Sequence, residues 1–333
     1  MLKNKKILFI CPSFFGYEKD IVEQFIALGA DVDYFDERPF TSSLAKILNR
    51  LNFKTFIKSD IEKHFTKMCN KAAETRYDYL FVISPETLEK SFIDKIQSTN
   101  KSMISILYMW DSFRNKSNAK KIVSCFDRVF SFDPTDRISG IDIKFLALFY
   151  NNDFKYIERD TLSSTQYAVS FIGTVHSDRV KLAKLIMKQF EDKGFNTFGF
   201  FYCPSKLLFL LKKVFTREFD FISFNEVSFS SMSKLEIKDV FINSSAVIDI
   251  QHPDQTGLTM RSVEMLGLNK KLITTNADIK NYDFFNSHNI AVINRYSPSI
   301  PEEFIDANYI KPNDSVVNQY SIQSWLRSLF NEN

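Results

Sequence analysis

The feature that most constrains the fold is a regular alternation of short apolar runs with amphipathic segments. In the first part of the chain, apolar runs with the length of buried strands lie at 7–11, 32–35, 79–84, 102–109 and 128–131. Apolar residues at helical spacing mark the segments between them, at 18–28, 58–74, 86–98 and 119–125. This βαβ order predicts a parallel sheet covered by helices on both faces.

The same alternation begins again after residue 165. Strand-like runs lie at 167–173, 196–201, 246–250, 271–274 and 289–292, with helical patterns at 178–193 and 258–268 and a short helix that closes at 244. A chain of 333 residues exceeds the usual size of a single core. We therefore predict an α/β protein with two Rossmann-like domains facing a cleft, at 1–155 and 156–315. In the remaining segment, 316–333, the helical stretch 320–330 is expected to pack back on the first domain.

Charge and cysteine spacing exclude several classes of protein. A net charge of +3 is too small for the dense basic footprint that nucleic-acid binding needs. The four cysteines stand far apart with no CxxC spacing, so core thiols in a reducing cytoplasm are expected. The apolar run at 7–11 stops at Pro12 and is too short for a signal peptide or a membrane span.

The strongest candidate site is the strand 246–250, the polar loop that follows it, and the helix after the loop. Backbone amides at the start of such a helix, together with its dipole, attract phosphate. We expect His252, Thr256, Gly257, Thr259, Arg261 and Glu264 to bind a donor here. The spacing predicts one helix face for Gly257, Arg261 and Glu264, with Glu264 roughly 10 Å from the helix start, where it would reach a ribose. The alternative is an ordinary capped helix with a surface Arg–Glu pair.

A second strand–glycine–helix pattern covers 169–179. Gly173 and Thr174 end the strand, and Arg179 in the first helical turn could reach a phosphate. His176 could lie over the cleft. The alternative is that His176 and Arg179 are solvated loop residues.

The first domain has loops at the corresponding strand ends, where ligands gather in open α/β sheets. The loop after 7–11 contains Phe15, Gly16, Tyr17 and Glu18, and a later loop contains Trp110 and Asp111. Beside an indole, the Asp111 carboxyl could act as a general base. Its other interpretation is a strand-end residue that caps the following helix.

Two further patterns concern metal binding and membrane contact. Asp31-Val-Asp33 matches the Asp-x-Asp motif of metal-dependent transferases, but it enters a strand instead of leaving one, so we predict no metal site. The segment 205–217 is basic and strongly apolar. It fits either a contact with an anionic membrane surface or a buried helix whose lysines snorkel.

Several of these segments together resemble the bacterial GT-B glycosyltransferases of the spore-maturation and surface-polysaccharide type. The resemblance rests on 15–18 with Asp-Glu-Arg-Pro39, on 108–112, on Phe171-Ile-Gly173, and on the Arg-x-x-Glu helix followed by Lys-Leu-Ile-Thr at 259–274. It spans roughly 7–295. It implies a nucleotide-sugar donor in the second domain, with Glu264 on the ribose, Arg261 and the 256–259 backbone on the diphosphate, and Gly173 shaping the loop.

The resemblance also implies an acceptor held mainly by the first domain, near Phe15, Gly16, Tyr17 and Trp110. Retaining members often carry two glutamates eight positions apart, but Thr256 and Leu272 flank Glu264 at that spacing. An inverting mechanism is therefore favoured, with Asp111 as the base and His176 or Glu18 as substitutes, and with no metal or other cofactor.

We accordingly expect a cytoplasmic transferase, in peripheral contact with the membrane through 205–217, that builds a bacterial surface glycan such as O-antigen or capsule on a lipid-linked or oligosaccharide acceptor. The rivals are a sugar-nucleotide epimerase and a non-catalytic nucleotide or sugar sensor.

Overall fold

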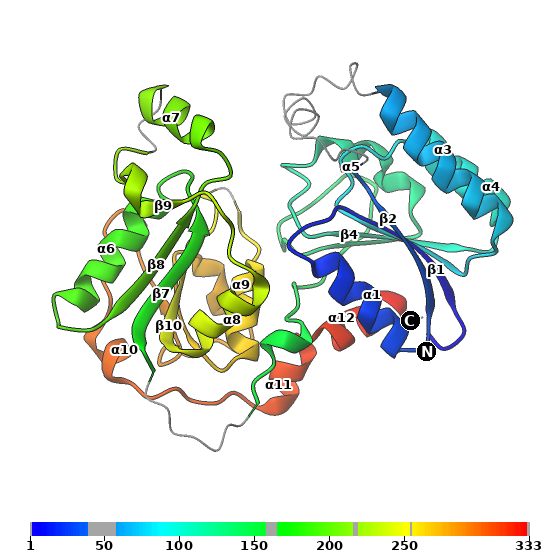
Figure 1. Cartoon of the computed structure of the whole chain (residues 1–333). Coiled ribbons are helices and arrows are strands. Elements are labelled where there is room, and N and C mark those ends of the chain that lie inside the picture. The colour runs from blue at the N-terminus through cyan, green and yellow to red at the C-terminus, as the bar shows by residue number, and fades with distance from the viewer. Residues whose placement is uncertain (1, 39–57, 158–164, 216–218, 254, 332–333) are drawn as a thin grey trace. The chain divides into compact units, whose positions relative to one another are not determined.

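The computed structural model describes residues 2–38, 58–157, 165–215, 219–253 and 255–331 (Figure 1). The chain forms two compact units. Unit 1 comprises Met1–Ala147 and Ile322–Asn333, and unit 2 comprises Leu148–Ser321. The boundaries expected from the sequence lie at 155 and 316.

Unit 1 is built on a six-stranded sheet with the order β2-β1-β3-β4-β5-β6, in which every pairing is parallel. Its strands are β1 (Lys6–Cys11), β2 (Asp31–Asp36), β3 (Tyr79–Ile83), β4 (Ile104–Met109), β5 (Arg128–Ser131) and β6 (Ile143–Phe145). All five residues of β3 are buried, as expected for a central parallel strand with both faces covered.

Alternate residues of the central strands enter two different cores. Leu8 and Ile10 of β1 pack in the cluster formed with α3 (Lys58–Glu74), α4 (Lys90–Thr99) and α5 (Ser117–Ile122). Phe9, between them, stacks on Phe81 and meets Phe25 of α1 (Tyr17–Ala27). Helix α12 (Ile322–Phe330) joins α1 on this face, where Phe330 contacts both Phe25 and Phe81 (Figure 1).

Unit 2 repeats the architecture with the order β12-β11-β10-β7-β8-β9, again parallel throughout. Its strands are β7 (Tyr167–Thr174), β8 (Thr197–Tyr202), β9 (Val227–Ser228), β10 (Ser244–Asp249), β11 (Lys271–Thr274) and β12 (Ile290–Val292). Its helices include α6 (Arg179–Glu191), α7 (Lys206–Phe215), α8 (Lys234–Ile242), α9 (Met260–Gly267), α10 (Glu302–Asp306) and α11 (Asp314–Gln319).

The predicted fold class is confirmed: the protein is α/β, with two parallel sheets covered by helices. Strands β6 and β9 were not predicted, because β6 is largely exposed and β9 has only two residues, so neither forms a buried apolar run. Helix α4 begins at Lys90 instead of 86, because the backbone amides of 86–88 donate to the carboxylate of Glu37. Within the described part of the chain, no helix is long and apolar enough to cross a membrane.

Candidate functional site

The strand order of unit 2 reverses between β7 and β10. Chain progression runs from β7 outward to β8 and β9, and then resumes on the other side with β10, β11 and β12. Loops after β7 and β10 therefore diverge at this point, and in open α/β sheets such a switch point at the carboxyl ends of the strands is where ligands bind. Helices α6 and α9 both begin at this edge.

Three arginines gather at this switch point: Arg179, Arg261 and Arg295. Arg179 is the first residue of α6, and Arg261 is the second residue of α9. The Nη1 of Arg261 donates to the carbonyl of Ile172 in β7, so its side chain crosses from the β10 side to the β7 side. Arg261 and Arg295 each repel the positive charge of Arg179, so both lie close enough to Arg179 to interact with it electrostatically. We call the three residues the arginine cluster.

The charge of Arg179 is poorly compensated. Burial, joined by repulsion from Arg261 and Arg295, lowers the pKa of Arg179 to about 10 from its usual 12.5, although the attraction of Asp249 opposes this. Among the residues that the structure describes, none accepts a hydrogen bond from the buried Nε of Arg179 or from that of Arg261. Buried donors without partners are uncommon in proteins. The cluster can therefore donate hydrogen bonds to an acceptor that carries negative charge.

Two carboxylates partly balance the arginine cluster. Arg295 Nη1 forms a 2.6 Å ion pair with Asp178, and its Nη2 donates to the carbonyl of Gln251. Asp249, buried at the end of β10, accepts hydrogen bonds from Thr259 Oγ1 (2.6 Å) and Ser262 Oγ (2.8 Å). Asp178 and Asp249 thus offset part of the charge of the three arginines.

Asp249 also determines which groups at the start of α9 are available to bind a ligand. Thr259 is the N-cap of α9, since its hydroxyl accepts from Ser262 N while donating to Asp249. The Thr259 hydroxyl is thus already engaged in the structure and does not point freely to a ligand. The contact of Thr259 with a phosphate stays a prediction. Such a contact would require the Thr259 hydroxyl to give up its hydrogen bond to Asp249.

The predicted single helix face of Gly257, Arg261 and Glu264 is wrong in one respect. Because α9 begins at Met260, Gly257 lies in the preceding loop, where its carbonyl accepts from Gln255 Nε2 and Asn276 Nδ2. Arg261 and Glu264 do share the helix, three residues apart, and Glu264 is buried. Its ribose contact stays a prediction.

Other predicted donor residues lie around the same edge. The Thr256 carbonyl accepts from Asn276 Nδ2, and His252 is exposed. Gly173 lies inside β7 and not in a turn. A Cβ at Gly173 would meet the ring of Phe171 at 2.6 Å, so packing within the strand already accounts for this glycine.

The loop between β7 and α6 contains the remaining predicted residues. Thr174, half-buried, is the last residue of β7. His176 is half-buried, and its Nδ1 lies 3.2 Å from Ser177 Oγ. Ser177 has a φ of 51°, a left-handed conformation that a residue with a side chain adopts at some cost. The loop is thus held in an unusual conformation directly before Arg179.

Unit 1 has its own switch point, between β1 and β3. The loop after β1 is held by Glu18, which is buried and accepts from Phe14 N (3.0 Å) and Ser13 Oγ (3.2 Å). Phe15 and Gly16 in this loop both have positive φ, 51° and 84°. The contacts of Glu18 thus give it a loop-positioning role, and its catalytic role stays a prediction.

The loop after β1, which Glu18 holds in place, carries a group of aromatic rings. The Phe14 ring lies 4.6 Å from that of Phe15, 6.5 Å from that of Tyr17 and 5.9 Å from that of Trp110, which follows β4. Phe15 is 65% exposed. Ser84, another residue of positive φ, accepts from the backbone N–H of Trp110 at 2.9 Å and so joins the loop after β4 to the end of β3. The predicted acceptor residues Phe15, Gly16, Tyr17 and Trp110 are therefore brought together.

Asp111 lies beside these rings in a polar network. One carboxylate oxygen accepts from Asn115 Nδ2 at 3.0 Å, and the other lies 3.6 Å from Lys116 Nζ. Lys116 also pairs with Glu86 at 2.5 Å. The half-buried carboxylate of Asp111 is thus stabilised by neighbouring donors, and its role as a base stays a prediction.

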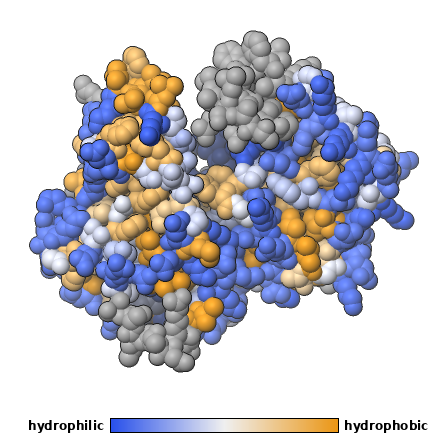
Figure 2. All heavy atoms as spheres, viewed as in Figure 1, coloured by the Kyte–Doolittle hydropathy of each residue, from blue (hydrophilic) through white to orange (hydrophobic). Residues whose placement is uncertain are grey.

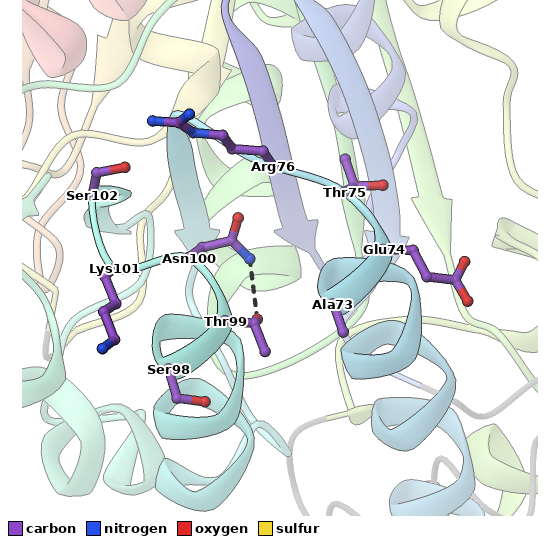
Figure 3. Close-up of a pocket in the computed structure, with 9 residues that line it drawn as sticks. All are labelled: Ala73, Glu74, Thr75, Arg76, Ser98, Thr99, Asn100, Lys101 and Ser102. Atoms are coloured by element: carbon purple, nitrogen blue, oxygen red, sulfur yellow. Dashed lines mark hydrogen bonds between the residues drawn. The ribbon is translucent and has the colours of Figure 1, made fainter.

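A separate hollow of about 520 Å³ lies on unit 1, formed by 73–76 and 98–102 (Figure 3). These residues precede β3 and β4, so the hollow is at the amino ends of the strands, away from the switch point. Asn100, its buried residue, already bonds Tyr77 N and the carbonyl of Ala72. Nothing in its lining calls for a ligand. Among the described residues, no group of three His, Cys, Asp or Glu side chains could hold a metal ion.

Sequence reasoning missed Arg295, Asp249 and Glu37. The first two follow or end a predicted strand, at 289–292 and 246–250, and a charged residue at the carboxyl end of a parallel strand is a usable signal. Glu37 follows β2, but the partners that give it a role are backbone amides 49 to 51 residues away, which no sequence pattern reveals.

No protein-family model matches the chain, and no curated protein sequence matches it. Solved structures do match over nearly the whole length. The Anabaena protein HepE in complex with UDP and glucose is 11% identical with a TM-score of 0.52, and the match covers 98% of this chain and 96% of that one. The UDP-GlcNAc 2-epimerase of Methanocaldococcus jannaschii, in complex with UDP-GlcNAc and UDP, is 12% identical with a TM-score of 0.51, over 97% and 99%.

A third match is the N-terminal domain of trehalose-6-phosphate phosphatase from Candida albicans, which is 8% identical with a TM-score of 0.61, over 98% of this chain and 96% of that chain. At such identities the likeness concerns the fold alone. The protein has the GT-B fold, in which two Rossmann-like domains follow one another in the chain.

Proposed function

We propose that unit 2 binds the diphosphate of a nucleoside-diphosphate sugar at the arginine cluster. The observation that carries this proposal is the buried, unpartnered Nε of Arg179 and of Arg261 at the switch point between β7 and β10. Arginine is suited to phosphate because its planar fork donates several hydrogen bonds and keeps its charge. The starts of α6 and α9 add their dipoles at the same edge.

The remaining donor contacts are proposed from position. Glu264, three residues after Arg261 on α9, would accept the two ribose hydroxyls. The loops with Thr174, His252 and Thr256 would border the nucleotide, with Thr259 available if it exchanges Asp249 for the ligand. The UDP and UDP-sugar bound to HepE and to the epimerase support a nucleotide-sugar ligand for this fold.

The reaction we propose is glycosyl transfer to an acceptor hydroxyl, as in the synthesis of a bacterial surface glycan. The acceptor oxygen bonds to the anomeric carbon while the bond from that carbon to the diphosphate breaks. The arginine cluster would stabilise the charge on the leaving diphosphate, and a carboxylate would take the acceptor proton. Asp111 is the proposed base, because it lies beside the aromatic group Phe14, Phe15, Tyr17 and Trp110, on which a sugar ring could stack.

Epimerisation is the second candidate, supported by the likeness to the UDP-GlcNAc 2-epimerase. The two reactions differ in what they need and what they form. Transfer consumes an acceptor and releases nucleoside diphosphate, whereas epimerisation changes the configuration of the donor sugar with no acceptor present.

The test incubates the full chain with UDP-glucose or UDP-GlcNAc, with and without a panel of alkyl glycosides. Transfer predicts UDP release and a gain in acceptor mass of one hexose or one N-acetylhexosamine residue, according to the donor, only when both substrates are present. Asp111→Asn should then lower the rate about 100-fold or more, the usual effect of losing a general base, with UDP affinity kept. Asp142→Asn, at an exposed position of unit 1, is the matched control. A new proton spectrum of the donor sugar without acceptor would instead identify an epimerase.

A further inference from the structure

Helix α7 of unit 2 carries an apolar surface that no described residue of the unit covers. Its inward residue is Phe209, which is 1% exposed and packs against the rings of Phe219, Phe224 and Phe229. The opposite side is formed by six exposed large side chains, the α7 apolar face: Leu207, Leu208, Leu210, Leu211, Val214 and Phe215. Figure 2 shows this gathering of apolar atoms where Figure 1 places α7.

The exposure of these side chains is unusually high for their kind. Leu207 is 66% exposed, Val214 75% and Phe215 79%. Single apolar residues on a surface are common, but a contiguous group on one helix marks an interaction site.

Three lysines flank the α7 apolar face. Lys206, Lys212 and Lys213 stand three or four residues from Phe209, so they lie on the inward half of the helix, at the border of the apolar face. Each ammonium lies over an inward ring, at 5.8 Å from Phe229, 5.5 Å from Phe219 and 5.8 Å from Phe209 respectively. The ammonium of Lys213 also donates to the backbone carbonyls of Phe219 and Ile222. The helix itself contains no acidic residue.

We propose that α7 docks the protein on a membrane that contains anionic lipids, with its apolar face inserted among the headgroups. An amphipathic helix that lies in the interface buries its apolar side and keeps its cations at the level of the headgroups. The lysines of α7 stand at the border that this position requires. With ten residues, the helix is about 15 Å long, and a span needs about 20 residues, so α7 lies in the surface and does not cross it.

A second copy of the chain is a poorer occupant for this face. Two α7 helices packed through their apolar faces would bring flanking lysines against lysines, with no acidic residue on either helix to pair with them. The anionic headgroups of a membrane instead carry charge opposite to that of the lysines. The proposal does not depend on the nucleotide site.

Co-sedimentation of the full chain with vesicles tests the proposal. The vesicles are pure phosphatidylcholine or a mixture with about one third phosphatidylglycerol. We expect binding to the mixed vesicles, and Leu207→Asp should lower the partition coefficient about tenfold, the effect of losing one inserted leucine. The control is Leu235→Asp, because Leu235 is 74% exposed and is likewise the second residue of its helix, α8. It should leave binding unchanged.

A charge variant, Lys206→Gln/Lys212→Gln, should weaken binding to the mixed vesicles and remove the preference over phosphatidylcholine. Three results would overturn the proposal: no binding to mixed vesicles, equal loss in Leu207→Asp and Leu235→Asp, or equal binding of the unaltered chain to both vesicle types. Size-exclusion chromatography provides a further test of the proposal. A chain that forms a dimer, that Leu207→Asp converts to a monomer, and that does not bind vesicles would assign the α7 apolar face to a second copy.

Discussion

Glu37 shows how one buried carboxyl can organise a loop of the candidate acceptor region. Its Oε1 accepts from the backbone amides of Glu86, Thr87 and Leu88, which shapes the loop after β3. Glu86 in that loop pairs with Lys116, the neighbour of Asp111. The other oxygen, Oε2, is buried and has no hydrogen-bond partner among the described residues. Glu37 is therefore linked to the proposed base Asp111 through three contacts, by way of Glu86 and Lys116.

The titration of Glu37 gives a pH prediction. Burial raises the pKa of Glu37 from 4.5 to about 7, although hydrogen bonds from Thr87 and Leu88 oppose the rise. The folded state then holds the proton more tightly than the unfolded state between pH 4.5 and 7, so the free energy of unfolding falls as pH rises through this window. At about 1.4 kcal/mol per pKa unit, the fall from this group is about 3 kcal/mol.

Urea unfolding of the natural chain and of Glu37→Gln at pH 4.5, 6 and 7.5 measures this fall in the free energy of unfolding. As pH rises, the unfolding free energy of Glu37→Gln should increase relative to that of the natural chain. The contributions of the other titrating groups cancel in this difference. A difference that stays constant across the three pH values would show that the pKa of Glu37 is the same in the folded and unfolded states.

At the residue scale, the sequence was informative where a residue's role depends on its place in a strand–loop–helix pattern. Arg179 and Arg261 were predicted because each begins a helix after a strand. The direction of the Arg261 side chain, back to the carbonyl of Ile172, depends on the neighbour relation of β7 and β10, which spacing does not reveal. Asp249 went unnoticed as the partner of Thr259 because the loop between β10 and α9 brings these two residues together.

At the element scale, α12 connects the end of the chain to the core of unit 1. Trp325, 1% exposed, meets the rings of Tyr108 at 4.8 Å and Phe81 at 5.9 Å, and Phe330 packs between Phe25 and Tyr79. Aromatic pairs in edge-to-face geometry add to the large apolar area that such rings bury. The helix is thus a structural component of the face that α1 also covers.

Truncating this helix's largest side chain should be costly. Trp325→Ala is expected to lower the unfolding free energy of unit 1 by about 3–5 kcal/mol, the range for aromatic residues in a core. Fluorescence reports on unit 1 alone, since the two tryptophans of the chain, Trp110 and Trp325, both belong to it. Trp110 remains as the probe in the variant. Trp325→Phe, which keeps a ring, should cost clearly less, and a loss below about 1 kcal/mol for Trp325→Ala would contradict the packing described.

The bounds of elements with strong hydrophobic periodicity were predicted closely. The bounds that depend on contacts with other parts of the chain were not. The helix predicted at 58–74 and the strands at 128–131 and 271–274 have the bounds of α3, β5 and β11. Helix α9 instead begins two residues later than predicted, at Met260, because Thr259 takes the N-cap position with its hydroxyl on Asp249. That hydrogen bond joins residues ten apart across a loop, beyond the reach of a periodic pattern.

At the scale of the whole molecule, the two units follow one design. Each has a six-stranded parallel sheet whose order reverses once, and each has left-handed backbone at that reversal, at Phe15, Gly16 and Ser84 in unit 1 and at Ser177 in unit 2. Strain of this kind gathers where loops are held for a ligand. The units differ in what they display there: aromatic rings and carboxylates in unit 1, arginines in unit 2.

The central claim is that the arginine cluster binds a nucleoside diphosphate, and calorimetric titration of UDP into the natural chain and into Arg179→Gln tests it most directly. Replacing one charged donor to phosphate should weaken UDP binding tenfold or more. Because the charge of Arg179 is disfavoured by burial, the same variant should melt no lower than the natural chain without ligand. Arg76→Gln, at the exposed hollow of unit 1, is the control and should change neither quantity. Unchanged UDP affinity, or an unliganded melting temperature that drops with Arg179→Gln, would contradict the account and make Arg179 a structural residue.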